Sequence, residues 1–113
     1  MSRPLIVAIW GPGSGERHWS EEAHRVIASF GERVDLFLDP NTRAAARVDR
    51  VDAALANADG LIFVGWGSMG IGMLTADRLA RAPNLRFIAS TSHFRQAEFL
   101  DVEAALARGI ALS

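Results

Sequence analysis

The second half of the chain, residues 58–113, constrains the fold more tightly than any other feature. It reads in order as an apolar strand, a glycine-rich loop, a short helix, a second strand, a polar loop, another helix and a final short strand. Strands that alternate with helices are joined by right-handed crossovers, which place the strands side by side in a parallel sheet. The sequence therefore predicts an α/β fold.

The first half repeats this alternation. Leu5–Trp10 is a continuous apolar run, as expected of a parallel strand that is buried on both faces. The other strands are expected at Arg33–Leu38, Leu61–Val64, Leu85–Ala89 and Ile110–Leu112. This rhythm indicates a flavodoxin-like, five-stranded parallel sheet of order 2-1-3-4-5 with helices on both faces. Residues 1–113 are expected to form a single domain, because the sequence shows no internal repeat and no linker.

The helices between the strands have their own start and stop signals. Ser20 is expected to cap the first helix, and Gly31 to follow its end. The residues expected on its buried face are Ala23, Val26, Ile27 and Phe30. Those expected on the buried face of the second helix are Ala44, Val48, Val51 and Leu55. Thr75 is expected to start the third helix, and Gly109 to end the fourth.

Composition excludes several classes of protein. The net charge is -1, and the 12 basic residues are dispersed among 13 acidic ones, so no nucleic-acid-binding surface is expected. No apolar run approaches the roughly 20 residues of a membrane span. Cysteine is absent, which excludes disulfides and thiolate chemistry and suits the cytoplasm. Every basic residue is an arginine, so a P-loop lysine and a Schiff-base lysine are excluded as well.

Ligands of open α/β sheets bind outside the carboxyl ends of the strands, where three loops are expected. The first loop, Gly11–Trp19, has evenly spaced glycines and not the GxGxxG pattern of a dinucleotide site. No acidic residue closes the second strand at the position that binds a ribose in such sites. The sequence also shows no histidine–carboxylate cluster and no nucleophile motif. Neither a metal site nor a catalytic pair is predicted.

The second loop, Gly65–Met73, contains four glycines within eight residues. Glycine at this density exposes backbone amides and lets the chain approach a small ligand closely. Trp66 and Met69 would supply an apolar wall beside them. A lid or a simple linker explains the same composition, so both interpretations stay open. In the third loop, Arg95 has the chemistry to pair with a carboxylate through two hydrogen bonds, or to point into solvent.

Residues 58–113 resemble the N-terminal part of the D-isomer-specific 2-hydroxyacid dehydrogenases. Three stretches carry the resemblance: ADG before an apolar strand, APNLR before the next strand, and LDVEAALARGI across the last helix. In that family the chain continues into a nucleotide-binding domain, which carries the GxGxxG loop and the catalytic residues. The resemblance implies the substrate-binding domain of an NAD(P)-dependent oxidoreductase that interconverts 2-keto acids and D-2-hydroxy acids.

The resemblance also implies where a small 2-keto or 2-hydroxy acid binds. One side of the cleft is expected in the second loop, and the substrate carboxylate is expected on backbone amides of the third. The residues implied are Trp66, Gly67, Ser92, His93, Phe94 and Arg95. The third loop departs from the family because its usual glycines are missing. No catalytic, cofactor-binding or metal-binding residue is implied, so NAD or NADP would be bound by the full-length protein and not by these residues.

The alternative is a stand-alone flavodoxin-like binding or interaction module without catalysis. A phosphoacceptor module is disfavoured, because Trp10 and Gly11 stand where an acidic pair is needed. On the leading interpretation the chain is inactive alone, and its missing partner is the nucleotide-binding domain. Ile110 and Leu112 are then expected to form an uncovered edge strand, which favours self-association into a homo-oligomer.

Overall fold

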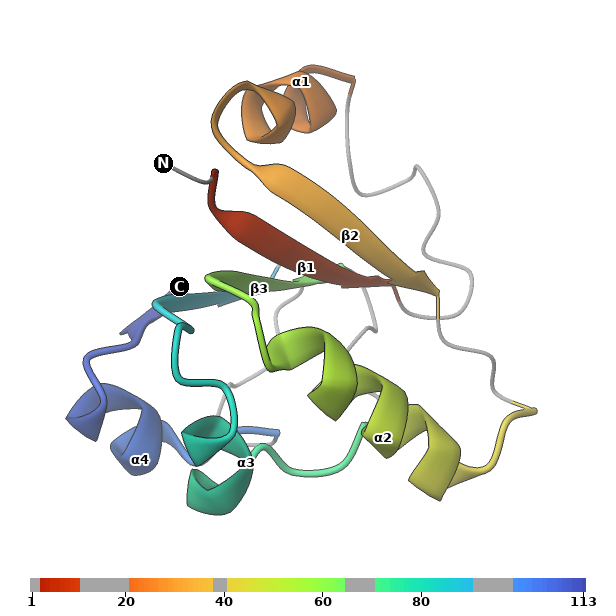
Figure 1. The fold of residues 1–113 in the computed structure, drawn as a ribbon, viewed down its shortest axis with the longest axis vertical. Coiled ribbons are helices and arrows are strands. Elements are labelled where there is room, and N and C mark those ends of the chain that lie inside the picture. Colours follow the sequence, from red (N-terminus) through yellow and green to blue (C-terminus); the bar gives the residue numbers. More distant parts are fainter. Residues whose placement is uncertain (1–2, 11–20, 38–40, 65–70, 91–98) are drawn as a thin grey trace.

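The computed structural model describes residues 3–10, 21–37, 41–64, 71–90 and 99–113. Within these ranges the chain forms one parallel sheet of five strands in the order β2-β1-β3-β4-β5 (Figure 1). The strands are β1 (Leu5–Trp10), β2 (Glu32–Phe37), β3 (Gly60–Val64), β4 (Phe87–Ser90) and β5 (Ala111–Leu112). The predicted α/β class and strand order are confirmed.

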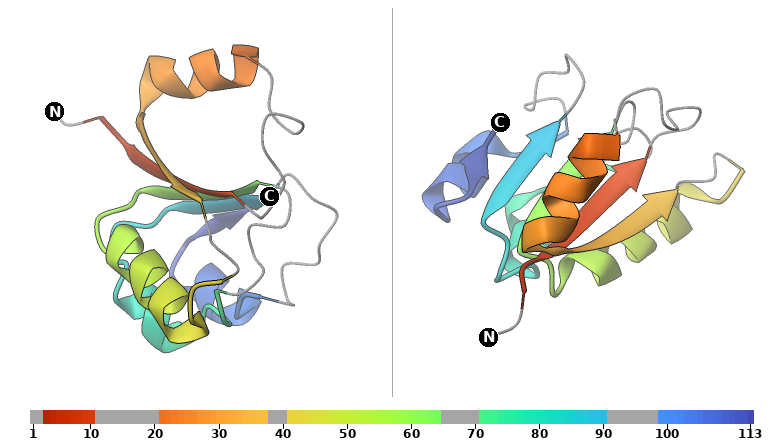
Figure 2. Two further views of the ribbon diagram at one scale, coloured as in Figure 1. Left: turned by 90° about the vertical axis from the view of Figure 1, so that its right-hand side faces the viewer. Right: turned by 90° about the horizontal axis from the view of Figure 1, so that it is seen from above.

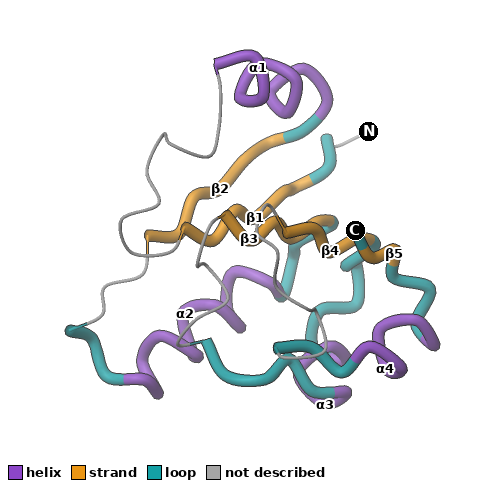
Figure 3. The backbone as a smooth tube through the Cα atoms, turned by 180° about the vertical axis from the view of Figure 1, so that it is seen from behind, coloured by secondary structure: helices purple, strands orange, loops and turns teal. Residues whose placement is uncertain are grey.

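Helices lie on both faces of the sheet, but unequally (Figure 2). One face carries α1 (Glu21–Phe30). The other face carries α2 (Ala44–Leu55), α3 (Ala76–Ala80) and α4 (Val102–Ala107), as the view from behind also shows (Figure 3). The crossover from β1 to β2 therefore passes on one side of the sheet, and those from β2 to β3, β3 to β4 and β4 to β5 pass on the other.

The larger core fills the space between the sheet and α2, α3 and α4. From α2, Val51 and Leu55 are buried in it, whereas Val48 is half-buried and Ala44 is exposed. The predicted buried face of this helix is thus confirmed for its last two turns and wrong for Ala44. The strand residues buried in this core are Val7, Ile9, Leu36, Leu61, Phe63 and Ile88.

The face covered by α1 has a smaller apolar cluster. It consists of Ala8, Trp10 and Val64, with Ile62 packed against them. Since β1 is buried from its second residue to its last, the predicted burial of this strand on both faces is confirmed.

Helix α1 contributes a narrow apolar face to this side of the sheet. Ile27 is only 8% exposed, but Val26 is 53% exposed. Neighbouring residues of a helix point about 100° apart, and α1 buries only the narrow face that carries Ile27. The prediction that Val26 belongs to the buried face is therefore wrong. The side chains of Ala23 and Phe30 lie outside the described part of the structure.

The predicted helix boundaries are largely confirmed. Thr75 caps α3, its hydroxyl accepting a hydrogen bond from the Arg78 amide at 3.4 Å. Gly109 follows α4 with a φ of 75°, a conformation that glycine adopts without strain. Asp101, which the sequence did not single out, caps α4 by accepting from the Ala104 amide at 3.1 Å. Ser20 lies outside the described residues.

Gly31 follows α1 as predicted, but for a different physical reason. Its amide donates to the Ile27 carbonyl at 2.9 Å, and its φ is not positive. A Cβ atom at this position would instead lie 3.0 Å from both Ile6 Cδ1 and the Pro4 carbonyl oxygen. Close packing against β1, and not a left-handed turn, requires the glycine.

Two strand predictions need correction. The fourth strand begins at Phe87 and not at Leu85, because the Leu85 amide donates to the Ala82 carbonyl at 3.2 Å in a turn that precedes the strand. Ile110 was expected to be uncovered, but it is 2% exposed and belongs to the larger core. Leu112 packs against the same core. The last strand, β5, is an edge strand that begins at Ala111 and not at Ile110; Ala111 is exposed, whereas Leu112 is half-buried.

At the start of β3, Gly60 leaves room for the ring of Phe87 on the neighbouring strand. A Cβ atom at Gly60 would lie 2.1 Å from Phe87 Cζ, which is far inside van der Waals contact. Gly60→Ala is therefore expected to lower the free energy of unfolding by about 1–3 kcal/mol, measured by urea denaturation. In a Phe87→Ala background the same change should cost much less. An equal cost in both backgrounds would contradict this explanation.

Candidate functional site at the carboxyl edge of the sheet

The carboxyl ends of β1, β3 and β4 meet at one edge of the sheet. Trp10, the last residue of β1, pairs with Val64, the last of β3, and Phe63 pairs with Ser90 at the end of β4. From β1 the chain crosses to one face of the sheet, and from β3 it crosses to the other (Figure 1). Ligands of open α/β sheets bind at such a reversal of strand order, which here falls between β1 and β3.

All six substrate-site residues that the sequence predicts lie outside the described residues. Two of them fall within residues 65–70, after β3, and four within residues 91–98, after β4. These residues are Trp66, Gly67, Ser92, His93, Phe94 and Arg95. The structure does, however, describe both strands that lead into these segments and the chain that follows each of them.

The chain that follows residues 65–70 pairs with the chain that follows residues 91–98. The Leu74 amide donates to the Phe99 carbonyl at 2.8 Å, and the Asp101 amide donates to the Leu74 carbonyl at 3.0 Å. These two hydrogen bonds form an isolated parallel bridge between Leu74 and Leu100. The Phe99 ring packs edge-on against Phe63 of β3, with the ring centroids 4.5 Å apart. The chain that follows each predicted site segment is therefore held in the Leu74–Leu100 bridge, which we call the anchor.

A half-buried ion pair lies next to this anchor. Arg78 of α3 donates through Nε to Asp52 Oδ1 of α2 at 2.7 Å. Its Nη1 donates to the carbonyls of Ile71 at 2.8 Å and Met73 at 3.0 Å. The Arg78 side chain is only 9% exposed. Sequence analysis missed this cluster, because 26 residues separate its two charged members and no local pattern connects them.

A second polar cluster lies on the α1 face, at the ends of β1 and β2. Asp35 Oδ1 accepts from Trp10 Nε1 at 3.0 Å and lies 3.1 Å from Arg33 Nε. The Trp10 ring stacks on Phe37, with centroids 5.5 Å apart and an interplanar angle of 20°. These contacts hold the bulky indole at the carboxyl end of β1.

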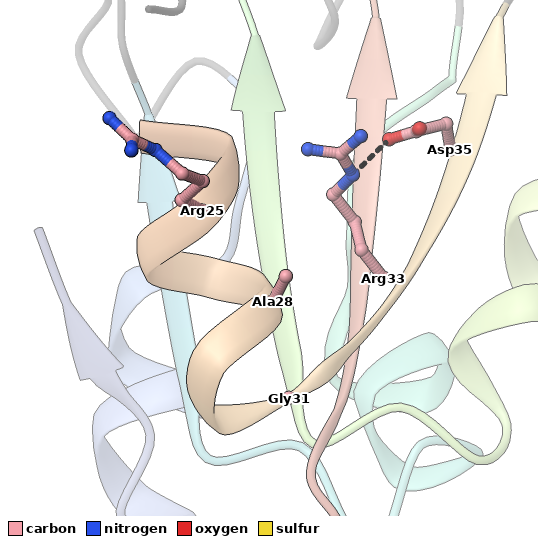
Figure 4. A pocket seen from close by; sticks show the side chains of 5 residues that line it. All are labelled: Arg25, Ala28, Gly31, Arg33 and Asp35. Carbon is pink, nitrogen blue, oxygen red and sulfur yellow. Dashed lines mark ion pairs between the residues drawn. The ribbon is translucent and has the colours of Figure 1, made fainter. Parts of the chain in front are cut away.

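A hollow of about 380 Å³ lies beside this cluster, between α1 and β2 (Figure 4). Its lining residues are Arg25, Ala28, Gly31, Arg33 and Asp35. The carboxylate of Asp35 already serves Arg33 and Trp10, so its charge is balanced within the protein.

Within the described ranges, no group of histidine and acidic side chains is arranged to bind a metal ion. In the same part of the chain, no helix has the length and apolarity needed to cross a membrane. The strand order, with its reversal between β1 and β3, defines an open α/β fold.

Comparison with known proteins shows which open α/β proteins this chain resembles. No protein-family model matches the sequence, and a search of curated proteins found no match. Solved oxidoreductases do match it: a phosphoglycerate oxidoreductase from Rhizobium etli is 29% identical over 97% of this chain, with a TM-score of 0.61. A glyoxylate reductase from Paecilomyes thermophila matches 100% of the chain (13% identity, TM-score 0.67). An NAD+-bound 3-phosphoglycerate dehydrogenase from Entamoeba histolytica matches 99% (18% identity, TM-score 0.58).

The solved structures that match are D-2-hydroxyacid dehydrogenases, so the resemblance predicted from the sequence is confirmed. The match extends beyond residues 58–113, where the sequence resemblance is concentrated, to nearly the whole chain. The chain spans between 30% and 32% of the length of these structures. Their activities, substrates and cofactors belong to proteins about three times as long.

Proposed function

We propose that this chain is the substrate-binding domain of an NAD(P)-dependent oxidoreductase that interconverts 2-keto acids and D-2-hydroxy acids. The observation that carries the proposal is the match of 97% of the chain to 30% of a phosphoglycerate oxidoreductase at 29% identity. The geometry of this sheet edge supports it, because the two segments with the predicted substrate residues follow adjacent strands, β3 and β4, and the chain after them is joined in the Leu74–Leu100 bridge.

In this proposal the substrate carboxylate binds to the segment after β4. The amides of Ser92, His93 and Phe94 donate to it, and the guanidinium of Arg95 pairs with it. Trp66 and Gly67, after β3, line the opposite side. Backbone amides and an arginine are both suited to a carboxylate, since each donates hydrogen bonds to an anionic oxygen. The substrate class is thus a small 2-keto or 2-hydroxy acid.

The described residues of this chain do not fit a dinucleotide. In a dinucleotide-binding fold, the end of the first strand allows close approach of the pyrophosphate, and an acidic residue at the end of the second binds the ribose. Here β1 ends in Trp10, whose indole is 4% exposed and stacked on Phe37 at the end of β2. NAD or NADP carries the hydride in such enzymes. We place its site in a separate nucleotide-binding domain.

A domain that supplies only one side of the site is expected to bind small carboxylates weakly, with a Kd of about 1 mM, or roughly −4 kcal/mol. Titration with glyoxylate, followed by ¹H–¹⁵N NMR, should shift the amide signals of residues 91–98. Arg95→Gln should weaken binding, whereas Arg25→Gln, which changes an exposed arginine of α1, should not. Shifts confined to α1 would show that the site is elsewhere.

The competing proposal is a stand-alone binding or interaction module. A nucleotide-binding domain that acts with this chain should be encoded next to it, as a strand followed by GxGxxG. Reading the gene beyond the Ser113 codon distinguishes the two proposals. Association with a second copy is a separate question, which sedimentation velocity over a range of concentrations answers.

A further inference from the structure

We propose that Arg78 is a positioning residue of the substrate site. Its guanidinium fixes the segment Ile71–Leu74, which follows residues 65–70, and that segment in turn fixes Phe99–Asp101, which follows residues 91–98. That the two intervening segments bind a carboxylate rests on the proposed function. That Arg78 fixes the anchor rests on the contacts of described residues alone.

The guanidinium of Arg78 joins three parts of the chain at once. Nε binds the Asp52 carboxylate of α2 at 2.7 Å, and Nη2 lies 2.7 Å from the same oxygen as an ion pair. Nη1 donates to two backbone carbonyls, those of Ile71 and Met73, at 2.8 and 3.0 Å. Because hydrogen bonds to a charged donor are stronger than neutral ones, these contacts restrain the backbone of the segment.

The backbone between the two carbonyls is shaped for this contact. Gly72 has a φ of 72°, a left-handed conformation that side chains rarely adopt. This turn lets the carbonyls on either side of it approach one nitrogen. A Cβ atom at Gly72 would lie 3.3 Å from Arg78 Nη1, so the glycine also makes room for the guanidinium.

Backbone hydrogen bonds connect the segment Ile71–Leu74 to the segment Phe99–Asp101. Leu74, one residue beyond Met73, forms the bridge with Leu100 through hydrogen bonds of 2.8 and 3.0 Å. Asp101, whose amide makes the second of these bonds, also caps α4 with its side chain. Among the described residues, the bridge is therefore the connection from Arg78 to the chain that follows residues 91–98.

An arginine is needed at this position, and a lysine is not equivalent. The planar guanidinium presents several N–H groups in fixed directions, whereas an ammonium is a compact charge at the end of a flexible chain. At 9% exposure, a lysine would have to satisfy Asp52 and two carbonyls from a single nitrogen. We expect Arg78→Lys to keep the ion pair and to lose at least one of the carbonyl contacts.

The test combines amide hydrogen exchange with ligand titration on the full chain. Arg78→Met removes all the hydrogen bonds and keeps an unbranched apolar side chain. Arg81→Met is the matched control, because Arg81 also lies near Asp52, at 3.8 Å, but is 67% exposed. In Arg78→Met the amides of Leu74 and Asp101 should exchange about tenfold faster than in the wild type, beyond any change in β1 and β3 amides. Arg81→Met should leave all of these rates unchanged.

Titration with glyoxylate then measures how the loss of Arg78 changes the affinity of the substrate site. Arg78→Met should raise the Kd for glyoxylate about tenfold, and Arg78→Lys should lie between it and the wild type. If Arg78→Met does not fold, Arg78→Lys and Asp52→Asn provide the same exchange measurement. Exchange at Leu74 and Asp101 that changes only in step with β1 and β3 would overturn the positioning role. Absence of glyoxylate binding by the wild type would instead overturn the proposed function, and the exchange result would still decide the role of Arg78.

Discussion

Replacing Phe63 by alanine is expected to lower the free energy of unfolding by about 3–5 kcal/mol, because the change empties the centre of the larger core. The Phe63 side chain is fully buried between the sheet and the helices α2, α3 and α4. Its ring also meets Phe99 edge-on at 4.5 Å, a contact that adds to the area it buries. A typical domain is stable by only 5–15 kcal/mol, so this variant should be close to unfolding at 37 °C.

Phe37→Ala is the matched control for this measurement. The same side chain is removed from a neighbouring part of the sheet, but Phe37 is 60% exposed and contacts Trp10 from the solvent side. Its loss should cost less than about 1.5 kcal/mol, mainly the stacking energy. Urea denaturation, monitored by circular dichroism, compares the two variants. Equal losses would mean that burial does not determine the stability of this sheet.

The second large effect concerns activity. Residues 1–113 alone are expected to show no oxidation of NADH with glyoxylate, pyruvate or hydroxypyruvate. The glycines after β1 lack the GxGxxG spacing. Residues 65–70 have this spacing, but α3 begins only at Ala76 and β4 ends at Ser90, whereas a dinucleotide site needs a helix that opens at the last glycine and an acidic residue after the next strand. The ends of β1 and β2 carry Trp10 and Phe37, which contact each other. Without a bound hydride carrier, the reaction has no source of hydride. Absorbance at 340 nm, compared with a buffer blank, gives the measurement.

A positive control makes this result informative. The same assay, with a complete 2-hydroxyacid dehydrogenase as enzyme, should consume NADH with at least one of the three keto acids. If residues 1–113 consumed NADH above the blank, the assignment of the cofactor site to another domain would be wrong. If they bound glyoxylate but did not consume NADH, the result would support the proposal that this chain binds the substrate and another domain binds the cofactor.

Much of the fold followed from local patterns in the sequence. The apolar run of β1 indicated a strand buried on both faces, and the strand–helix alternation indicated a parallel sheet of order 2-1-3-4-5. Thr75 and Gly109 marked helix ends correctly, because capping and left-handed turns depend on residues adjacent in sequence. Such features are readable from the chain because their causes are local.

Errors arose where packing, and not local preference, decides. Val26 has the spacing of a buried residue, yet it points to solvent because α1 packs on the sheet with a narrow face. Ile110 was expected at an open edge, but the turn after α4 directs it into the larger core. In both cases periodicity identified an apolar residue correctly, and only the position of the neighbouring elements showed which way it points.

By itself, the sequence determined the order of strands and helices and the resemblance to 2-hydroxyacid dehydrogenases. Only the tertiary structure brought Arg78 to Asp52 and Leu74 to Leu100, across 26 residues in each case. No periodic pattern in the sequence predicts such pairs, because their residues are far apart in the chain and meet only in the folded protein. A glycine such as Gly72 can be recognised in the sequence as part of a turn. That Arg78 binds the carbonyls of this turn is known only from the tertiary structure.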